Sequence, residues 1–468
     1  MSNKEKKGLN ISVKSFITAI AVILALMIVS YVLTMVIPGG SYARIEDENG
    51  NMIIDTVAGF SAVEGGLPFW KWALSPFLVL GASGSSTLIA VIIFLLVIGG
   101  VFSSLDKCGL MAYILNKTAN KFGKVRYKLM AIVVLFFMAF GSLIGSFEEC
   151  VPLVPLVCAL SISLGWDALT GVGMSLLAAG CGFAAGVCNP FTIGVAQELA
   201  NLPMFSGIWL RLVSFILIYG LLLVFLRIYA KRIECPLDHT AQAVDFAQNK
   251  KLDRGMICFL SILGAGIIII LSSALIPALQ DLTMIIVAVM FLAAGIVSTL
   301  VSGMTVKELL KTFWNGITSI FPAVFMILMA SSIKYTLEEA HVLDSILHWA
   351  VGLAETLPNW SVILFIYLIV LVMNFFIPSG SAKAFMLIPL IVPLASIFNI
   401  SPQLCVVAFA FGDGFSNVFY PTNPALLISL GLADVSYADW FKWSVKFQIL
   451  NLILTSGILM LGLAVGYQ

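Results

Sequence analysis

Apolar stretches long enough to cross a lipid bilayer recur from one end of this chain to the other. A helix needs about 20 apolar residues to span the hydrocarbon core. The hydrophobic pattern therefore predicts an all-α polytopic membrane protein with about nine membrane-spanning helices. We expect these helices at residues 15–37, 86–104, 168–200, 208–230, 255–278, 283–304, 318–336, 403–431 and 440–465.

Two further apolar stretches are better explained as re-entrant helical hairpins, which enter the membrane and return to the same side. Residues 129–164 contain "GSFEEC" near their middle, and residues 361–399 contain "IPSGSAKAF" there. Irregular backbone at membrane depth persists only where it is buried in protein or lines a wet cavity. The two hairpin turns are therefore predicted to lie inside the protein, at a polar site.

The distribution of lysine and arginine indicates how the chain is oriented, because these residues are enriched in cytoplasmic loops. They cluster at the N-terminus, at residues 105–128 and at 227–232, whereas acidic residues dominate 38–70 and 335–360. The N-terminus is therefore predicted to be cytoplasmic. Since the number of spans is odd, the C-terminus is predicted to be outside.

The same short motifs occur in the same order in two halves of the chain, residues 1–232 and 255–468, joined by a predicted cytoplasmic linker at 233–254. Each half has Gly-Ser at its hairpin turn, then a paired-proline run, then Gly-x-Gly-Phe and Asn-Pro in the next span. The first hairpin is predicted to open inside and the second outside. Inverted-topology repeats with interrupted helices point to a secondary transporter's binding site. We expect interrupted helices at 168–200 and 403–431.

The amino-acid composition indicates which surroundings and macromolecular partners the chain is suited to. Hydrophobic residues make up 60% of the chain and charged residues 10%, whereas soluble domains carry about 25% charged residues. The lipid bilayer is therefore the expected surrounding, and a net charge of +1 indicates no nucleic-acid partner. The eight cysteines lie mostly in apolar segments without a CxxC spacing, so we expect neither a disulfide nor a metal site from them.

Glu148 and Glu149 lie next to each other in strongly apolar sequence. A carboxylate at the bilayer centre costs roughly 2.5–3.5 kcal/mol on insertion scales, so the pair indicates either a function or a polar surface loop. We expect the hairpin turn to bring them to a wet central site, where they bind a proton, Na⁺, or a substrate ammonium or guanidinium. Neighbouring helical side chains diverge by about 100°, so one acid is expected to face the site and the other a structural partner.

Asn-Pro in the middle of each predicted interrupted helix favours unwound backbone over a simple kink, because proline removes a helical hydrogen bond. The freed carbonyls and half-helix ends would then coordinate ion and substrate. Neutral oxygens are available on the interrupted helices and the hairpin turns from Asn189, Thr192, Asn417, Thr422, Asn423, Ser146, Ser379 and Ser381. If Na⁺ is the coupling ion, we expect its site at Ser146, Asn189, Ser381 and Asn423.

Two further charged residues, Lys383 and Asp413, are predicted at membrane depth in the second half. Lys383 either extends outward as an anchor, pairs with Asp413, or holds a substrate carboxylate. Asp413 is expected to have a functional role. Arg211 lies at the outer end of a predicted helix, where long basic side chains usually extend to the membrane surface.

The chain resembles the YfcC family, whose members carry the provisional name of basic amino acid antiporters, over most of its length. The resemblance is closest in "EECVPLVPL", "GCGFAAGVCNPFTIGVAQELANLPMFSG", "PSGSAKAFMLIPLIVPLA" and "AFGDGFSNVFYPTNP". That family belongs with the four-carbon dicarboxylate anaerobic carriers in the ion transporter superfamily. The resemblance implies a transport domain that holds both hairpins, a scaffold domain through which two copies can form a homodimer, and alternating access.

These features predict a secondary active transporter of the bacterial cytoplasmic membrane, which moves a small charged metabolite by exchange or by H⁺ or Na⁺ coupling. The acids of the first hairpin favour a basic amino acid of the arginine or ornithine type. A C4-dicarboxylate, held by Lys383 and half-helix N-termini, is the alternative. A channel or a membrane enzyme is the alternative of a different class: a channel should lack stoichiometric counterflow, and an enzyme should need a nucleophile or metal set, which the sequence does not show. The sequence has no GxxxxGK[ST] phosphate loop, so ATP-driven transport by this chain alone is not expected. No cofactor beyond the coupling ion is expected.

Overall fold

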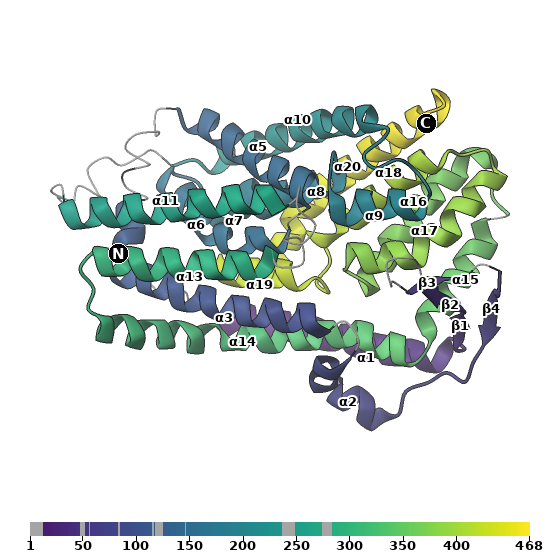
Figure 1. Ribbon diagram of the computed structural model, residues 1–468, viewed down its shortest axis with the longest axis horizontal. Helices are drawn as coiled ribbons and strands as arrows, with labels where there is room; N and C mark the ends of the chain where they lie inside the picture. The colour runs from purple at the N-terminus through teal and green to yellow at the C-terminus, as the bar shows by residue number, and fades with distance from the viewer. Residues whose placement is uncertain are drawn as a thin grey trace.

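The computed structural model arranges the chain in two layers of helices that run along the long axis of Figure 1. The residues that the structure describes are 13–46, 52–55, 57–82, 85–114, 117, 125–145, 147–235, 249–273, 283–354 and 356–468. Among them, eight helices are long and apolar enough to cross a membrane. The predicted class, an all-α polytopic membrane protein, is confirmed.

The first layer, which we call the α14 layer, is built around α14 (Val306–Glu339). α14 packs against α3 (Ser85–Lys107), where a Cβ on Gly316 would lie 2.2 Å from the carbonyl oxygen of Gly99. Small residues allow this close approach, which is typical of helix packing in membranes. The layer also contains α1 (Val13–Val36), α2 (Phe69–Leu78), η1 (Val79–Gly81), α11 (Lys250–Ser273) and α13 (Thr283–Val301).

α14 is longer than the span predicted at residues 318–336. It begins at a capping box, in which the Thr305 hydroxyl accepts from the Glu308 N–H and the Glu308 carboxylate accepts from the Thr305 N–H at 3.1 Å. This reciprocal arrangement fixes the first turn. The helix then continues without a break for 34 residues, so a segment rich in charged and aromatic residues becomes part of the same helix.

The second layer, which we call the hairpin layer, contains the two hairpins, the two interrupted helices and two further long helices. The first half supplies α5 (Arg126–Ile144), η3 (Glu148–Leu153), α6 (Val154–Ser163), α7 (Ala168–Val172), η4 (Gly173–Leu177), α8 (Ala178–Ala185), η5 (Pro190–Gly194), α9 (Val195–Leu199) and α10 (Ile208–Ile233). The second half supplies α16 (Asn359–Phe376), α17 (Gly380–Ile397), α18 (Pro402–Asn417), α19 (Pro424–Leu432) and α20 (Tyr437–Ala464).

The two hairpins approach the middle of the protein from opposite ends. At the start of α5, Arg126 donates to the carbonyl of Leu164 after α6, at 3.1 Å, and to the carboxylate of Glu234 after α10, at 2.9 Å. Both ends of the first hairpin therefore meet the C-terminal end of α10. The ends of the second hairpin lie at the other end of the molecule, near the strands (Figure 1). The relation of the two halves as inverted repeats stays a prediction.

In the described part of the chain, four three-residue strands supplement the helices at the end where the second hairpin begins and ends. β1 (Gly40–Tyr42) pairs antiparallel with β4 (Phe60–Ala62), and β2 (Arg44–Glu46) pairs with β3 (Met52–Ile54). The neighbouring helix α15 (Val342–Ala354) is tied to them by Asp344, which accepts from Arg44 and from the Tyr42 N–H. Burial and the nearby Asp344 charge raise the pKa of Tyr42 to about 12.

Candidate functional site

The first interrupted helix unwinds between α8 and η5. α8 ends at Ala185 and Gly186 follows with φ +49°, a conformation that glycine adopts without strain. The helix resumes at Pro190, where the Asn189 Oδ1 accepts from the N–H groups of Phe191 at 2.9 Å and Thr192 at 3.3 Å. Asn189 therefore caps the second half-helix, with proline at its first position.

The second interrupted helix repeats this arrangement. α18 ends at Asn417, and the chain is not helical again until Pro424. The Asn423 Oδ1 accepts from the N–H groups of Ala425 at 2.9 Å and Leu426 at 3.3 Å. Asn423 also donates to the Asn417 Oδ1 at 3.1 Å. Both Asn-Pro motifs thus place an unwound segment and a capped half-helix in the middle of the hairpin layer, and each asparagine oxygen predicted for Na⁺ already accepts two backbone hydrogen bonds.

Glycines allow the two unwound regions to meet each other. A Cβ on Gly180 would lie 2.4 Å from Val418 in the second break, and a Cβ on Gly414 would lie 2.4 Å from Ala184 near the first. One glycine of each Gly-x-Gly-Phe motif therefore allows α8 and α18 to pack closely, whereas Gly182 packs on α5 and Gly412 on α16.

The hairpin turns also contact the breaks through glycine. A Cβ on Gly145 would lie 2.1 Å from the Asn189 Oδ1, and a Cβ on Gly380 would lie 2.6 Å from the Asp413 Oδ2 and 2.7 Å from Thr192. Each turn therefore lies directly on an interrupted helix. Ser146, which we predicted at the first turn, lies outside the described residues.

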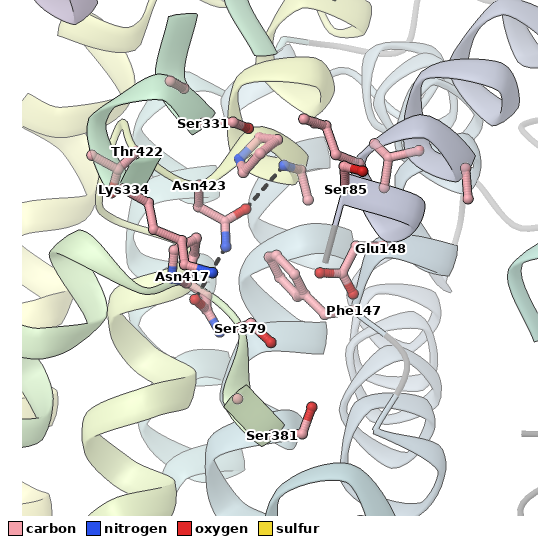
Figure 2. Close-up of a pocket in the computed structure, with 18 of the residues that line it drawn as sticks. Ser85, Phe147, Glu148, Ser331, Lys334, Ser379, Ser381, Asn417, Thr422 and Asn423 are labelled. Carbon is pink, nitrogen blue, oxygen red and sulfur yellow. Dashed lines mark hydrogen bonds between the residues drawn. The ribbon is translucent and has the colours of Figure 1, made fainter. Parts of the chain in front are cut away.

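A cavity of about 660 Å³ separates the hairpin turns from the α14 layer, a volume in the range of small-molecule sites. Figure 2 shows polar side chains that project into it from several elements. The predicted site residues that line the cavity are Glu148, Glu149, Thr192, Ser379, Ser381, Asn417, Thr422 and Asn423. The structure thus brings residues of both halves to one space.

Glu148 and Glu149 both line this cavity. They lie at the start of the short helix η3 next to the hairpin turn, and one carboxylate oxygen of Glu149 is buried. That one acid faces the site and the other a structural partner stays a prediction. The Cys150 and Pro152 side chains that follow them are buried in protein. The hairpin turn therefore places both acidic residues next to the cavity, and Figure 2 shows the Glu148 side chain in it.

Lys383 and Asp413 lie behind the cavity rather than in it. Both side chains are fully buried, and the Lys383 ammonium pairs with the Asp413 Oδ1 at 2.6 Å. Lys383 also donates to the carbonyl of Ile377 at 3.1 Å and to the Asn374 side chain. Of the three alternatives for Lys383, the outward anchor was wrong and the pair with Asp413 is observed.

Asn374 on α16 extends this pair into a network. The two N–H groups of its Nδ2 are shared among three acceptors, the Ser416 hydroxyl at 2.6 Å, the Asn417 Oδ1 at 2.9 Å and the carbonyl of Asp413 at 3.1 Å. The network joins both helices of the second hairpin to the end of α18. Because Asn417 also accepts from Asn423, the buried charges hold the unwound segment in place from behind.

The α14 layer contributes cavity residues that the sequence analysis missed. Ser331, Lys334, Tyr335 and Glu338 line the cavity from the C-terminal part of α14. Lys334 and Glu338 are one turn apart, and their charged groups are 3.6 Å from each other. The available signal was a single lysine at the end of an otherwise apolar predicted span, a pattern that more often marks the membrane surface.

Arg211 does not extend to the membrane surface as expected. Its side chain is fully buried, and its Nη2 donates to the carbonyl of Phe205 at 3.1 Å. The reason is that the C-terminal segment covers this end of α10: Tyr467 donates to the carbonyl of Gly207, and its ring packs on Trp209. Arg211 thus lies at a helix end, as predicted, but the C-terminal segment buries its side chain.

Comparison with known proteins places this architecture among membrane carriers. The family model described as C4-dicarboxylate anaerobic carrier, DcuC, matches residues 16–464. A relative from Escherichia coli (strain K12), provisionally named as the basic amino acid antiporter YfcC, is 30% identical over 416 residues, which cover 82% of this chain and 80% of that protein. An uncharacterized protein of Haemophilus influenzae (strain ATCC 51907 / DSM 11121 / KW20 / Rd) is 22% identical over 94% of this chain and 95% of its own length.

Two solved transporter structures are similar to the chain at lower identity. The Alcanivorax borkumensis YdaH transporter is 16% identical with a TM-score of 0.43, over 97% of this chain and 99% of that one. Neisseria gonorrhoeae MtrF, described in a study of antimetabolite efflux pumps, is 15% identical with a TM-score of 0.42, over 94% of both chains. The family match and the identity to YfcC show that this chain belongs to the C4-dicarboxylate anaerobic carrier (DcuC) family and is a membrane transporter, not an enzyme.

Proposed function

We propose that this transporter carries a basic amino acid, of the arginine or ornithine type, by a secondary active mechanism. The observation that supports this proposal is the position of Glu148 and Glu149, two adjacent acidic residues that both line the central cavity. An ionised carboxylate in a partly dry site binds a guanidinium or ammonium through charge-assisted hydrogen bonds, which are the stronger kind.

The balance of charge around the cavity supports the same substrate class. Among the described residues that line it, Glu148, Glu149 and Glu338 are acidic and Lys334 is basic. The Lys383–Asp413 pair behind the cavity is neutral as a whole. An excess of carboxylates favours a ligand with net positive charge, as arginine and ornithine have at neutral pH.

The family description gives a reason to keep a second candidate. Members of the matching family are described as carriers of C4-dicarboxylates, and a dicarboxylate would require a different use of the same acids. In that case Glu148 or Glu149 would hold the coupling H⁺ or Na⁺, and Lys334 would be the cavity residue that contacts the anion. The two candidates therefore make opposite predictions for cationic and anionic ligands.

Ligand affinity in charge-neutral variants distinguishes these candidates. We would measure the thermal stability of purified protein against arginine, ornithine, citrulline and fumarate, with and without Na⁺, because a ligand selective for the folded state raises apparent stability. Glu148→Gln or Glu149→Gln should weaken arginine binding by about 10- to 150-fold, since a hydrogen bond to a charged group contributes about 1.5–3 kcal/mol. Citrulline, which lacks the cation, should respond much less.

The matched control is Glu46→Gln, which removes an exposed carboxylate on β2 far from the cavity and should leave all four affinities unchanged. Tight binding of fumarate with no response to arginine would replace the basic amino acid with a dicarboxylate. Recovery of the Glu148→Gln defect at high Na⁺ would instead assign that carboxylate to the coupling ion.

The orientation in the membrane is part of this proposal. Positive charge near the predicted inner loops supports a cytoplasmic N-terminus and an outer C-terminus. The cavity-lining part of α14 lies towards the end of the molecule that holds the strands (Figure 1), so the cavity would face outward in this state. A single cysteine at Gln468 should then react with an impermeant thiol reagent added from outside.

A further inference from the structure

Lys334 occupies an unusual position for a lysine in a membrane-spanning helix. It lies near the C-terminal end of α14, its side chain is 31% exposed, and it lines the central cavity. Among the described residues that line this cavity, it is the only lysine or arginine. Figure 2 shows Lys334 with Thr422 and Asn417 on one side of the cavity and Glu148 on the opposite side.

The ammonium of Lys334 has binding capacity left. It makes a loose ion pair with Glu338 at 3.6 Å, and no hydrogen bond joins it to another described residue. A lysine ammonium has three N–H donors. Lys383, by contrast, contacts Asp413, Asn374 and the carbonyl of Ile377, so its donors are used inside the protein. Of these two lysines, Lys334 is the one that can meet a ligand.

The hydroxyl group of Thr422 also has hydrogen-bonding capacity that the described residues do not use. Thr422 lines the cavity, and its buried Oγ1 has no hydrogen-bond partner among the residues that the structure describes. Thr422 lies in the unwound segment just before the Asn423 cap, so its place is fixed by the second break. An ammonium and a hydroxyl donor on one side of a cavity match the two oxygens of a carboxylate.

We propose that Lys334 is a specificity-determining residue that binds the α-carboxylate of the amino acid, while the first hairpin binds its side-chain cation. This assignment rests on the proposed function and adds the recognition of the head group. Glu338, one turn further along α14, completes the complementary pair by accepting the α-ammonium. The substrate class is then an L-α-amino acid with a cationic side chain, bound across the cavity between the α14 layer and the hairpin turn.

Arginine and agmatine isolate this contact, because agmatine keeps the guanidinium and the amine of arginine but has no carboxylate. We would measure both affinities in the purified full-length protein by titration calorimetry. Lys334→Met should weaken arginine by about 10- to 150-fold, the range for hydrogen bonds between charged groups, and change agmatine by less than about twofold. Lys334→Arg should restore most of the arginine affinity, because it returns a cation to the same place.

Lys311→Met is the matched control, since Lys311 lies on the same helix, is exposed, and does not line the cavity. An unchanged arginine affinity in Lys334→Met, or an equal loss for arginine and agmatine, would overturn the assignment. Should Lys334→Met not yield folded protein, Lys334→Gln is measured against the same two ligands with the same criteria. Failure of the proposed function has a different signature: the wild-type protein would then bind neither arginine nor agmatine.

Discussion

The first hairpin has two acidic residues at the cavity, whereas the second hairpin keeps its charged residue inside the protein. Glu148 and Glu149 follow the first turn and line the central space. Lys383 follows the second turn at a similar distance, yet it is fully buried and paired with Asp413. Both turns rest on an unwound helix through a glycine, Gly145 or Gly380. The same backbone arrangement thus places acidic residues at the cavity in the first half and a buried ion pair behind it in the second half.

This difference indicates that the charged residues of the two hairpins have different roles: those of the first are placed to meet a ligand, and that of the second stabilises the site. A buried ion pair contributes little net stability compared with apolar packing, but the loss of one partner leaves an uncompensated charge. The Lys383–Asp413 pair, joined to Asn374, therefore specifies one position for the unwound segment of the second half. In the first half, by contrast, Glu148 lines the cavity, where it can meet a ligand.

Breaking the buried pair should have the largest effect on stability. Lys383→Met leaves Asp413 charged and buried without its partner, which costs about 3–5 kcal/mol in comparable buried pairs. Glu148→Gln, the matched change in the first half, should alter stability by less than about 1 kcal/mol, because it removes no internal partner. The measurement is the unfolding midpoint of each purified variant in detergent.

Neutralising both members of the buried pair tests whether the cost comes from the unpaired charge. Lys383→Met combined with Asp413→Asn should recover much of the stability that Lys383→Met loses, since no buried charge is left over. If the double variant is as unstable as the sum of the single variants, the pair does not act as a unit. Equal destabilisation by Glu148→Gln and Lys383→Met would remove the distinction between the halves.

The turns, helix breaks and caps of this site could be predicted from the sequence more readily than the partners of its charged residues. Gly-Ser at each turn, Gly-x-Gly-Phe and Asn-Pro are local signals, and each marks a turn, a close helix contact or a cap where the structure has one. These features depend on residues close together in the chain. The predicted hairpin turns and helix breaks therefore lie near the cavity. Eight of the twelve residues predicted for the site line it.

The partners of charged residues depend on packing between distant elements and were harder to predict. Lys383 and Asp413 are 30 residues apart and meet only because α17 packs on α18. Lys334 faces a cavity because the hairpin layer stands opposite α14, and Arg211 is buried because the C-terminal segment covers it. A lone basic residue near the end of an apolar span has the same local pattern in all three environments.

Filling the space at the hairpin turns should have the next largest effect, and it should be greater in the first half. Gly145→Ala would place a Cβ 2.1 Å from the capping oxygen of Asn189, at φ +74°. Left-handed strain and overpacking together should destabilise the protein by about 2–4 kcal/mol. Gly380→Ala meets the Asp413 Oδ2 at 2.6 Å without a positive φ, and should cost about 1–3 kcal/mol.

The control for the glycine series is Gly220→Ala on α10, where a Cβ would meet no atom within 4 Å. Since alanine is favoured over glycine inside a helix, this variant should gain about 0.5–1 kcal/mol in stability. A loss of stability in Gly220→Ala equal to that in Gly145→Ala would show that the hairpin turns are not under special constraint.

The smallest effects are expected when the asparagine caps are removed, and these distinguish a structural cap from a transport role. Asn189→Ala loses one cap, at a cost of about 1 kcal/mol. Asn423→Ala also loses the bond to Asn417 and should cost about 0.5–1.5 kcal/mol more. Ser436→Ala, which removes the cap of α20 away from the cavity, should match Asn189→Ala in stability. Arginine exchange in proteoliposomes should fall in both asparagine variants and stay unchanged in Ser436→Ala; equal exchange in all three would assign the Asn-Pro motifs to folding alone.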